Sequence, residues 1–233
     1  MTTRPPFENF PNAPSYFGHW ADFSSAGSAD CFTATLIASG TAAVIDTVVG
    51  GAIRLSGAAT TDNSGVNHQL TNAAFGLVLG KEIQYEARVR FGESTSANVV
   101  TESDMYAGLA TLDTSIVISN PTNGIYFRKD DGDTNLDCIV RFGSTDVGTA
   151  LAAATVAVDT WYVLSIRITC DSVTSGKATI TFYLDGTQIA SMSLSSLTMA
   201  ASAMMAPMCC FLTGDATGTK YLDVDYYGAQ QQR

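Results

Sequence analysis

Acidic side chains gather in residues 130–137, where carboxylate oxygens could coordinate a hard cation such as Ca²⁺. The segment holds four aspartates around Gly132. An EF-hand loop places its glycine sixth, after acidic residues at the first, third and fifth positions. Here the glycine is third, so the spacing favours a solvated hairpin loop over a calcium site. We predict no cofactor.

Carboxylates two residues apart share one face of a strand and could carry out glycoside hydrolysis. That reaction needs two such groups about 5 to 9.5 Å apart across the scissile bond. Glu102 and Asp104 meet the strand spacing, but Ala107 stands where a further glutamate would be required. Asp223 and Asp225 also share a face, and they alternate with apolar residues. Both pairs are more typical of a polar outer face, and we predict that the chain is not an enzyme.

Glu86, Arg88 and Arg90 form the third constellation, which resembles the Arg/Glu/Arg cluster of sandwich polysaccharide lyases. A lyase also needs a Tyr or His general base with a pKa near neutrality. His19 and His68 are the only histidines, and neither has a recognisable context. His68 lies in a polar stretch, so we expect it on the surface. Cross-strand ion pairing explains Glu86 and Arg88 adequately.

The sequence offers no activated nucleophile and no framework of paired thiols. It lacks G-x-S-x-G, a glycine-rich phosphate loop, H-E-x-x-H and C-x-x-C. An odd number of scattered cysteines does not make a disulfide framework. We expect reduced thiols packed in the core, and synthesis in a reducing cytoplasm. The five are Cys31, Cys138, Cys170, Cys209 and Cys210.

The charge and the apolar content of the chain argue against two classes of partner, nucleic acids and membranes. The 233 residues include 12 basic and 22 acidic side chains, a net charge of −10, without a Lys/Arg run. Such a surface repels nucleic acid. The N-terminus lacks the apolar region of a secretory signal, and the most apolar window, residues 199–212, is too short to span a bilayer. We therefore predict neither a nucleic-acid nor a membrane partner.

Short alternating segments predict an antiparallel β protein. Apolar and polar residues alternate over residues 81–91, which is typical of a half-exposed strand. Asp185 and Gly186 join two alternating runs and suit a type I′ turn. About twelve strands are expected, with a polar loop at 60–67 and a loop or one-turn helix at 148–158. The prediction is a two-sheet antiparallel jelly-roll sandwich, residues 25–233, in one domain.

Residues 1–24 differ from the rest. They hold four of the six prolines together with several aromatics. Proline is unsuited to a central strand, whereas a disordered tail is poor in aromatics. An extended arm that docks through its aromatics, on its own body or on a neighbouring subunit, satisfies both facts. The predicted assembly contacts are Phe7, Phe10, Tyr16, Phe17 and Trp20.

Several segments between Gly50 and Tyr227 carry a resemblance to a known superfamily. They are residues 51–56, 85–91, 123–127, 160–162 and 182–186. Through them the chain resembles the concanavalin A-like (laminin G-like) jelly-roll superfamily. More narrowly, with its Asp-Val-Asp-Tyr-Tyr ending and glutamine-rich tail, it is similar to tailed-bacteriophage virion proteins of this fold, which serve as capsid decoration or cement.

This resemblance implies a non-enzymatic virion protein that decorates and stabilises a bacteriophage head. The implied location is the capsid surface, after synthesis in the host cytoplasm. The implied partners are the major capsid protein and sister subunits in a homo-oligomer, with a trimer as the expected state. The alternative is a lectin-like module for host-surface glycans; a glycan-cleaving enzyme ranks below it. Strand aromatics could stack on sugars, but packing is favoured for Tyr106, Tyr126, Tyr183 and Tyr227.

Overall fold

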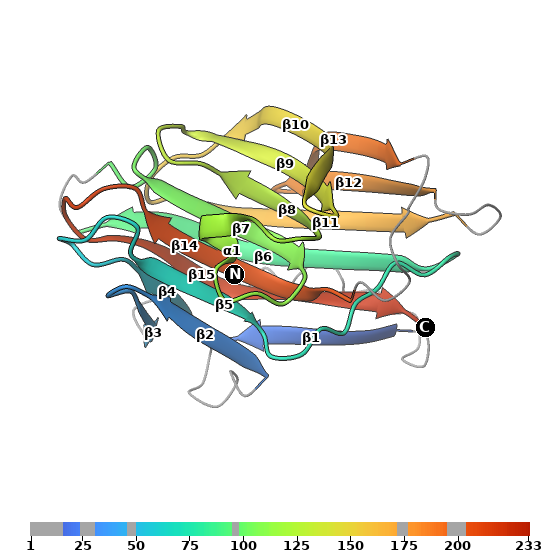
Figure 1. Cartoon of the computed structure of the whole chain (residues 1–233), viewed down its shortest axis with the longest axis horizontal. Coiled ribbons are helices and arrows are strands. Elements are labelled where there is room, and N and C mark those ends of the chain that lie inside the picture. The colour runs from blue at the N-terminus through green and yellow to red at the C-terminus, as the bar shows by residue number, and fades with distance from the viewer. Residues whose placement is uncertain (1–15, 24–30, 46–49, 95–97, 172–176, 195–203) are drawn as a thin grey trace.

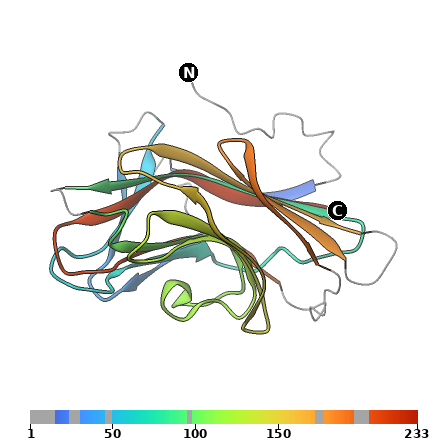
Figure 2. The same cartoon turned by 90° about the horizontal axis from the view of Figure 1, so that it is seen from above.

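The protein is a sandwich of two antiparallel sheets, as the computed structural model shows (Figures 1 and 2). The structure describes residues 16–23, 31–45, 50–94, 98–171, 177–194 and 204–233. These residues contain fifteen strands and one short helix, against about twelve strands expected. The predicted all-β, two-sheet fold is confirmed. No helix in the described ranges is long and apolar enough to cross a membrane.

One sheet, called the β6 sheet, has the C-terminal strand near its centre. Its path is β13 (Thr187–Leu194), β12 (Ala178–Leu184), β11 (Trp161–Cys170), β6 (Glu82–Glu93), β15 (Lys220–Gln232), β4 (Ala52–Ser56) and β3 (Thr41–Ile45). Strand β1 (Tyr16–Asp22) also pairs with β15. Strand β15 thus has β6 on one side, and β4 followed by β1 on the other.

The opposing sheet, called the β7 sheet, carries a short helical loop on its outer face. Its order is β10 (Thr145–Thr155), β9 (Asn135–Phe142), β8 (Gly124–Lys129), β7 (Ser103–Ala110), β14 (Ala206–Thr213), β5 (Gly65–Leu70) and β2 (Phe32–Ile37). Helix α1 (Ile116–Ser119) lies over β7 and β14 in Figure 1. Ile116 and Val117 pack there with Tyr106 and Tyr126 in a second, smaller apolar cluster.

The main core fills the space between the sheets because each strand sends alternate residues inward. On β6, Tyr85, Val89 and Phe91 are buried, as the alternation predicts. Across the sandwich, the rings of Phe127 and Phe182 meet edge to face at 5.2 Å between centroids. Burial of such side chains stabilises the fold by about 1.5–3 kcal/mol each.

The predicted hairpin between β12 and β13 forms at Asp185 and Gly186. Their φ angles are 49° and 78°, so both central residues have the positive φ that a type I′ turn requires. The turn is also held from outside. The Val163 amide donates to the Asp185 carboxylate at 2.8 Å, and the Asp185 amide donates to the Val163 carbonyl.

One sequence expectation about local structure is wrong, and another is correct only in part. Residues 148–158 were expected as a loop or a helical turn, but most of them belong to edge strand β10. This strand is interrupted by bulges, and alanine has weak β-propensity, so pairing with β9 decides its conformation. The loop expected over residues 60–67 is confirmed as far as Ser64, but the last three residues belong to β5, whose amide side chains line the outer face.

The cysteine prediction is correct for four of five residues. Cys138, Cys170, Cys209 and Cys210 are buried and unpaired, and burial raises the pKa of the Cys138 thiol to about 12. Cys31 is exposed, because it precedes β2 outside the core, so the expectation of a core thiol is wrong there.

Candidate functional site

The best-built polar cluster lies on the outer face of the β6 sheet. Residues paired across antiparallel strands share a face, so the register places polar side chains from five strands side by side. We call this surface the polar face. Its principal residues are Trp20, Arg54, Glu86, Arg88, Arg90, Trp161, Ser165, Asp223, Asp225 and Tyr226.

Glu86 occupies the middle of the polar face. The Tyr226 hydroxyl donates to its Oε1 at 2.9 Å, and the Ser165 hydroxyl donates to its Oε2 at 3.1 Å. The side chain is fully buried beneath its neighbours. Burial raises the pKa of Glu86 to about 7, because desolvation outweighs the two hydrogen bonds that favour the charged form. Near neutral pH the carboxyl group can therefore either accept or donate a proton.

Asp223 joins three strands of this face through arginines. Arg54 on β4 approaches it with Nε at 2.7 Å and Nη2 at 3.0 Å, which is a bidentate pair. Arg90 on β6 approaches from the other side at 2.6 Å. Arg88 is paired separately with Asp225 at 2.5 Å. Both carboxylates are thus neutralised by partly exposed guanidinium groups.

Aromatic residues of β11 and β1 share the polar face. On β11, the Trp161 ring has the guanidinium carbons of Arg88 and Arg90 at 4.7 and 5.0 Å from its centroid. On β1, Trp20 pairs with Gly228, which in turn pairs with Glu86. A Cβ at Gly228 would come within 2.3 Å of the His19 carbonyl oxygen and 2.9 Å of the Trp20 ring, so only glycine lets β1 lie so close to β15 here. Half-buried rings beside charged donors suit a polar ligand that also has apolar faces.

The predicted arm residues fall into two groups. Phe7 and Phe10 lie outside the described residues. Tyr16, Phe17 and Trp20 lie on β1, which pairs with β15 of the same chain from Tyr16 opposite Gln232 to Asp22 opposite Tyr226. Phe17 also stacks on Phe75, with 5.4 Å between ring centroids. Contacts of these residues with another chain stay a prediction.

The two carboxylate pairs that the sequence suggested lie on different sheets. Asp104 is on β7, where burial raises its pKa to about 6 and the Asp131 amide donates to it at 2.8 Å. The neighbouring Glu102 lies 3.3 Å from the buried ammonium group of Lys220. Asp223 and Asp225 form ion pairs on the polar face. The carboxylates of both pairs are therefore engaged in hydrogen bonds or ion pairs within the fold.

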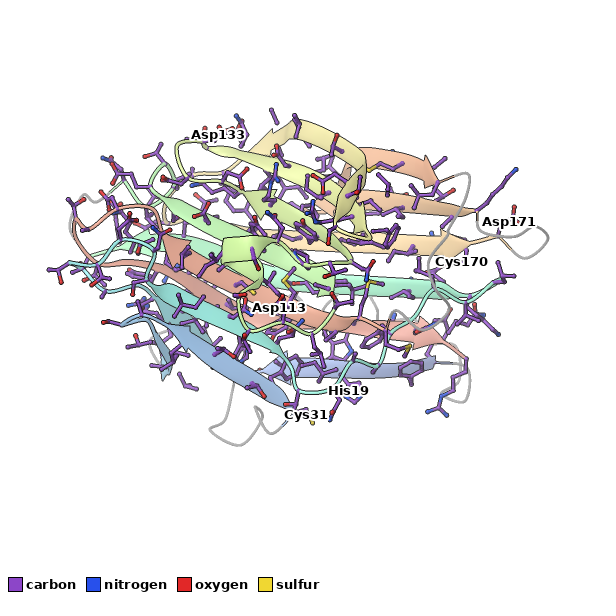
Figure 3. All side chains as sticks on the ribbon, viewed as in Figure 1. His19, Cys31, Asp113, Asp133, Cys170 and Asp171 are labelled. Atoms are coloured by element: carbon purple, nitrogen blue, oxygen red, sulfur yellow. The ribbon has the colours of Figure 1, made fainter. Side chains whose placement is uncertain are left out.

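The acidic segment 130–137 forms the connection from β8 into β9. Asp133 accepts hydrogen bonds from the amides of Thr134 and Asn135, so its carboxylate is used within the turn. Figure 3 shows Asp133 at one end of the molecule, far from the labelled Asp113. Within the described ranges, no group of three or more His, Cys, Asp or Glu side chains is arranged to hold a metal ion.

The expectation that His68 is a surface residue is wrong. Strand β5 turns His68 into the core between the sheets, where it is 2% exposed. Its ring stacks with Phe32, and its Nδ1 lies 2.7 Å from the Tyr227 hydroxyl. Burial lowers its pKa to about 4, so the ring is neutral at physiological pH. His68 thus has no access to a ligand on either outer face.

Most of the strand tyrosines pack in the interior, as we predicted from the sequence. Tyr106, Tyr126 and Tyr227 are buried, whereas Tyr183 is half-buried. The sequence alone does not single out Trp161 and Tyr226 as members of the polar face. The alternation of β11 and β15 is their signal, but only strand pairing shows that Trp161 lies opposite Arg90 and Tyr226 opposite Arg88.

Comparison with known proteins identifies the fold and no narrower family. No protein-family model and no curated protein matches the sequence. Among solved structures, a protein of unknown function from Shewanella oneidensis MR-1 is 15% identical, with a TM-score of 0.62, over 94% of this chain and 87% of that chain. The CBM2 module of Lactobacillus casei BL23 phage J-1 evolved Dit is 12% identical, with a TM-score of 0.57, over 93% and 96%.

A solved enzyme structure is as similar to this chain as the phage module is. The endo-β-1,4-glucuronan lyase from the fungus Trichoderma reesei is 14% identical, with a TM-score of 0.56, over 91% of this chain and 94% of that chain. Identities this low establish a shared concanavalin A-like jelly-roll architecture only. The architecture is common to enzymes and to binding modules, so function must be argued from the site.

Proposed function

We propose that this protein is a non-enzymatic carbohydrate-binding jelly roll and that its polar face holds the glycan. The observation that carries the proposal is that Trp161, which lies against Arg88 and Arg90, shares one outer sheet face with Trp20. Support also comes from the full-length similarity to a CBM2 module and to a lyase named for a glucuronan.

The chemistry of this face suits sugar. The apolar C–H faces of pyranose rings stack on indole rings, and sugar hydroxyls need donors and acceptors held in place. The N–H groups of Arg88 and Arg90 supply donors, since each guanidinium has more N–H groups than its aspartate uses. Beneath them, the buried Glu86 accepts from the Tyr226 hydroxyl and so fixes its orientation on this face.

Binding is favoured over cleavage by the state of the carboxylates. Hydrolysis by two carboxylates needs both free to reach the glycosidic bond. On the polar face Asp223 is held by Arg54 and Arg90, and Asp225 is held by Arg88. Glu86 instead accepts hydrogen bonds from Tyr226 and Ser165 beneath the surface.

The test is a glycan array probed with the wild-type protein, followed by titration of the best glycan. We expect Trp161→Ala and Arg88→Ala to weaken binding at least tenfold, which corresponds to about 1.4 kcal/mol. Arg141→Ala on the opposite sheet is the control, and its affinity should match the wild type. Absence of binding to any glycan, or equal binding by Trp161→Ala, would refute the proposal.

A second candidate function is a structural role on a bacteriophage virion. The similarity to a phage module over 96% of that module favours it. In this proposal the protein lies on the capsid surface, bound to the major capsid protein and to sister subunits in a trimer. The test is co-purification with intact phage heads. A deletion of residues 1–15 should release it if the arm makes the contact, and recovery of the protein in the free fraction alone would refute this role.

A further inference from the structure

A small cavity lies on the opposite side of the molecule from the polar face. It has a volume of about 270 Å³ and opens between β2, β5 and the loop that follows β7. Its lining includes Thr33, Thr35, Asn67, Gln69, Leu112 and Asp113. Pockets for drug-sized ligands begin at about 300 Å³, so this cavity suits a smaller molecule.

The floor of the cavity follows from the alternation of β5. His68 points into the core, so Asn67 and Gln69 on either side of it point outward. Strand β2 pairs Thr35 with Asn67 and Thr33 with Gln69, which places two hydroxyls beside two amides. These four floor residues therefore offer groups that form hydrogen bonds without carrying charge.

The two amide side chains hold the wall of the cavity in place. Asn67 Nδ2 donates to the Asp113 carbonyl at 2.8 Å. Gln69 Nε2 donates to the Thr111 carbonyl at 3.3 Å, and its Oε1 accepts from the Asp113 amide at 3.2 Å. Figure 3 shows Asp113 in front of the β7 sheet, close to α1. The wall is thus preformed, which lowers the entropic cost of binding.

One acceptor at this floor has no partner. Asn67 is 1% exposed, and its Oδ1 receives no hydrogen bond from the part of the chain that the structure describes. Rotating the amide would not satisfy it, because Oδ1 would then face the Asp113 carbonyl that Nδ2 now serves. Buried polar atoms are nearly always paired, so an unpaired acceptor beside a cavity indicates a missing donor.

We propose that this cavity binds one neutral sugar unit, with a ring hydroxyl donating to Asn67 Oδ1. The hydroxyls of Thr33 and Thr35 would bond further hydroxyls, and the exposed side chain of Leu112 would cover an apolar ring face. A negatively charged sugar is disfavoured, since the lining includes Asp113 and no cationic residue. The site is on the other sheet from the polar face. Binding in this cavity can therefore be tested independently of the function proposed above.

The test is an NMR titration of the full chain with glucose, galactose, mannose and N-acetylglucosamine. We expect at least one of them to shift the amide resonances of Asn67, Thr35 and Leu112, with a Kd on the order of 1–10 mM. Thr35→Trp should fill the cavity and weaken binding at least tenfold. Leu36→Trp is the matched control, because the exposed Leu36 is next on β2 and does not line the cavity. Thr35→Val, which keeps the volume and removes the hydroxyl, should weaken binding a few-fold.

The outcomes are separable. Shifts confined to β6, β11 and β15 would overturn the second site while supporting the polar face. No shift with any of the four sugars, or full binding by a folded Thr35→Trp, would also overturn it. Shifts at the cavity that persist in Trp161→Ala would establish it even if the polar face binds no glycan.

Discussion

The hydroxyl of Tyr226 donates a 2.9 Å hydrogen bond to Oε1 of Glu86 across strands β15 and β6. A bulge between Val224 and Tyr226 makes this contact possible. Strict alternation from the inward Val224 would turn Tyr226 inward. The extra residue instead leaves Tyr226 on the polar face and Tyr227 in the core. A single backbone irregularity thus positions the hydroxyl beside Glu86.

Glu86→Gln should stabilise the protein at alkaline pH. The folded-state pKa of Glu86, about 7, is above its ordinary value of 4.5, so the folded protein keeps a proton that the unfolded chain releases. The contribution of Glu86 to wild-type stability therefore falls as pH rises from 4.5 to 7, by about 3 kcal/mol. Urea unfolding of both proteins from pH 4 to 8 should show equal stability at the acid end and a more stable variant at the alkaline end. Parallel curves would contradict this.

His68 should make stability depend on pH in the opposite direction, with the protein less stable at acid pH. Its folded-state pKa of about 4 is below the ordinary 6.5, so the unfolded chain binds the extra proton. Its contribution is complete above pH 6.5 and is lost, by about 3 kcal/mol, as pH falls to 4. His68→Gln should lack this loss, so the wild-type advantage over the variant shrinks on acidification. An advantage that stays constant from pH 7 to 4 would show that His68 does not titrate there.

Asp223→Asn should destabilise the fold by about 2 kcal/mol. The change leaves Arg54 and Arg90 without a carboxylate on a face where that carboxylate is buried. Loss of one partner from a fully buried pair costs about 3–5 kcal/mol, and the partial exposure of both arginines reduces this. Denaturant unfolding at pH 7 measures it. The control is Asp146→Asn, which breaks the more exposed pair with Arg141 and should cost less than about 1 kcal/mol.

Two truncations should distinguish the contribution of residues 1–15 to stability from that of strand β1. Removing residues 1–15 leaves all described contacts in place, so the melting temperature should stay within about 2 °C of the wild type. Removing residues 1–22 also deletes β1, its pairing with β15 and the Phe17–Phe75 stack. That loss should lower the melting temperature by at least about 5 °C. Equal melting of the two truncated proteins would mean that β1 adds nothing to stability.

Local pattern predicted the elements whose signal lies within a few residues. Strand β6 followed from its alternation, and the β12–β13 turn followed from Asp185 and Gly186. Local pattern did not predict the strands whose conformation depends on pairing with segments distant in the chain. The alanine-rich β10 is a strand because β9 pairs with it, and β5 is hidden in a polar segment because its outward amides serve the loop after β7.

The sequence by itself determined the two-sheet β architecture, because period-two alternation and turn chemistry are properties of consecutive residues. It also placed Glu86, Arg88 and Arg90 on one strand face. Only the tertiary structure decided what surrounds them. Tyr226 bonds Glu86, and Trp20 and Trp161 join the same face, from strands far apart in the chain. Their places depend on a register and a bulge that no local pattern encodes. The burial of His68 has the same origin, since β2, β5 and β15 must assemble before its ring is covered.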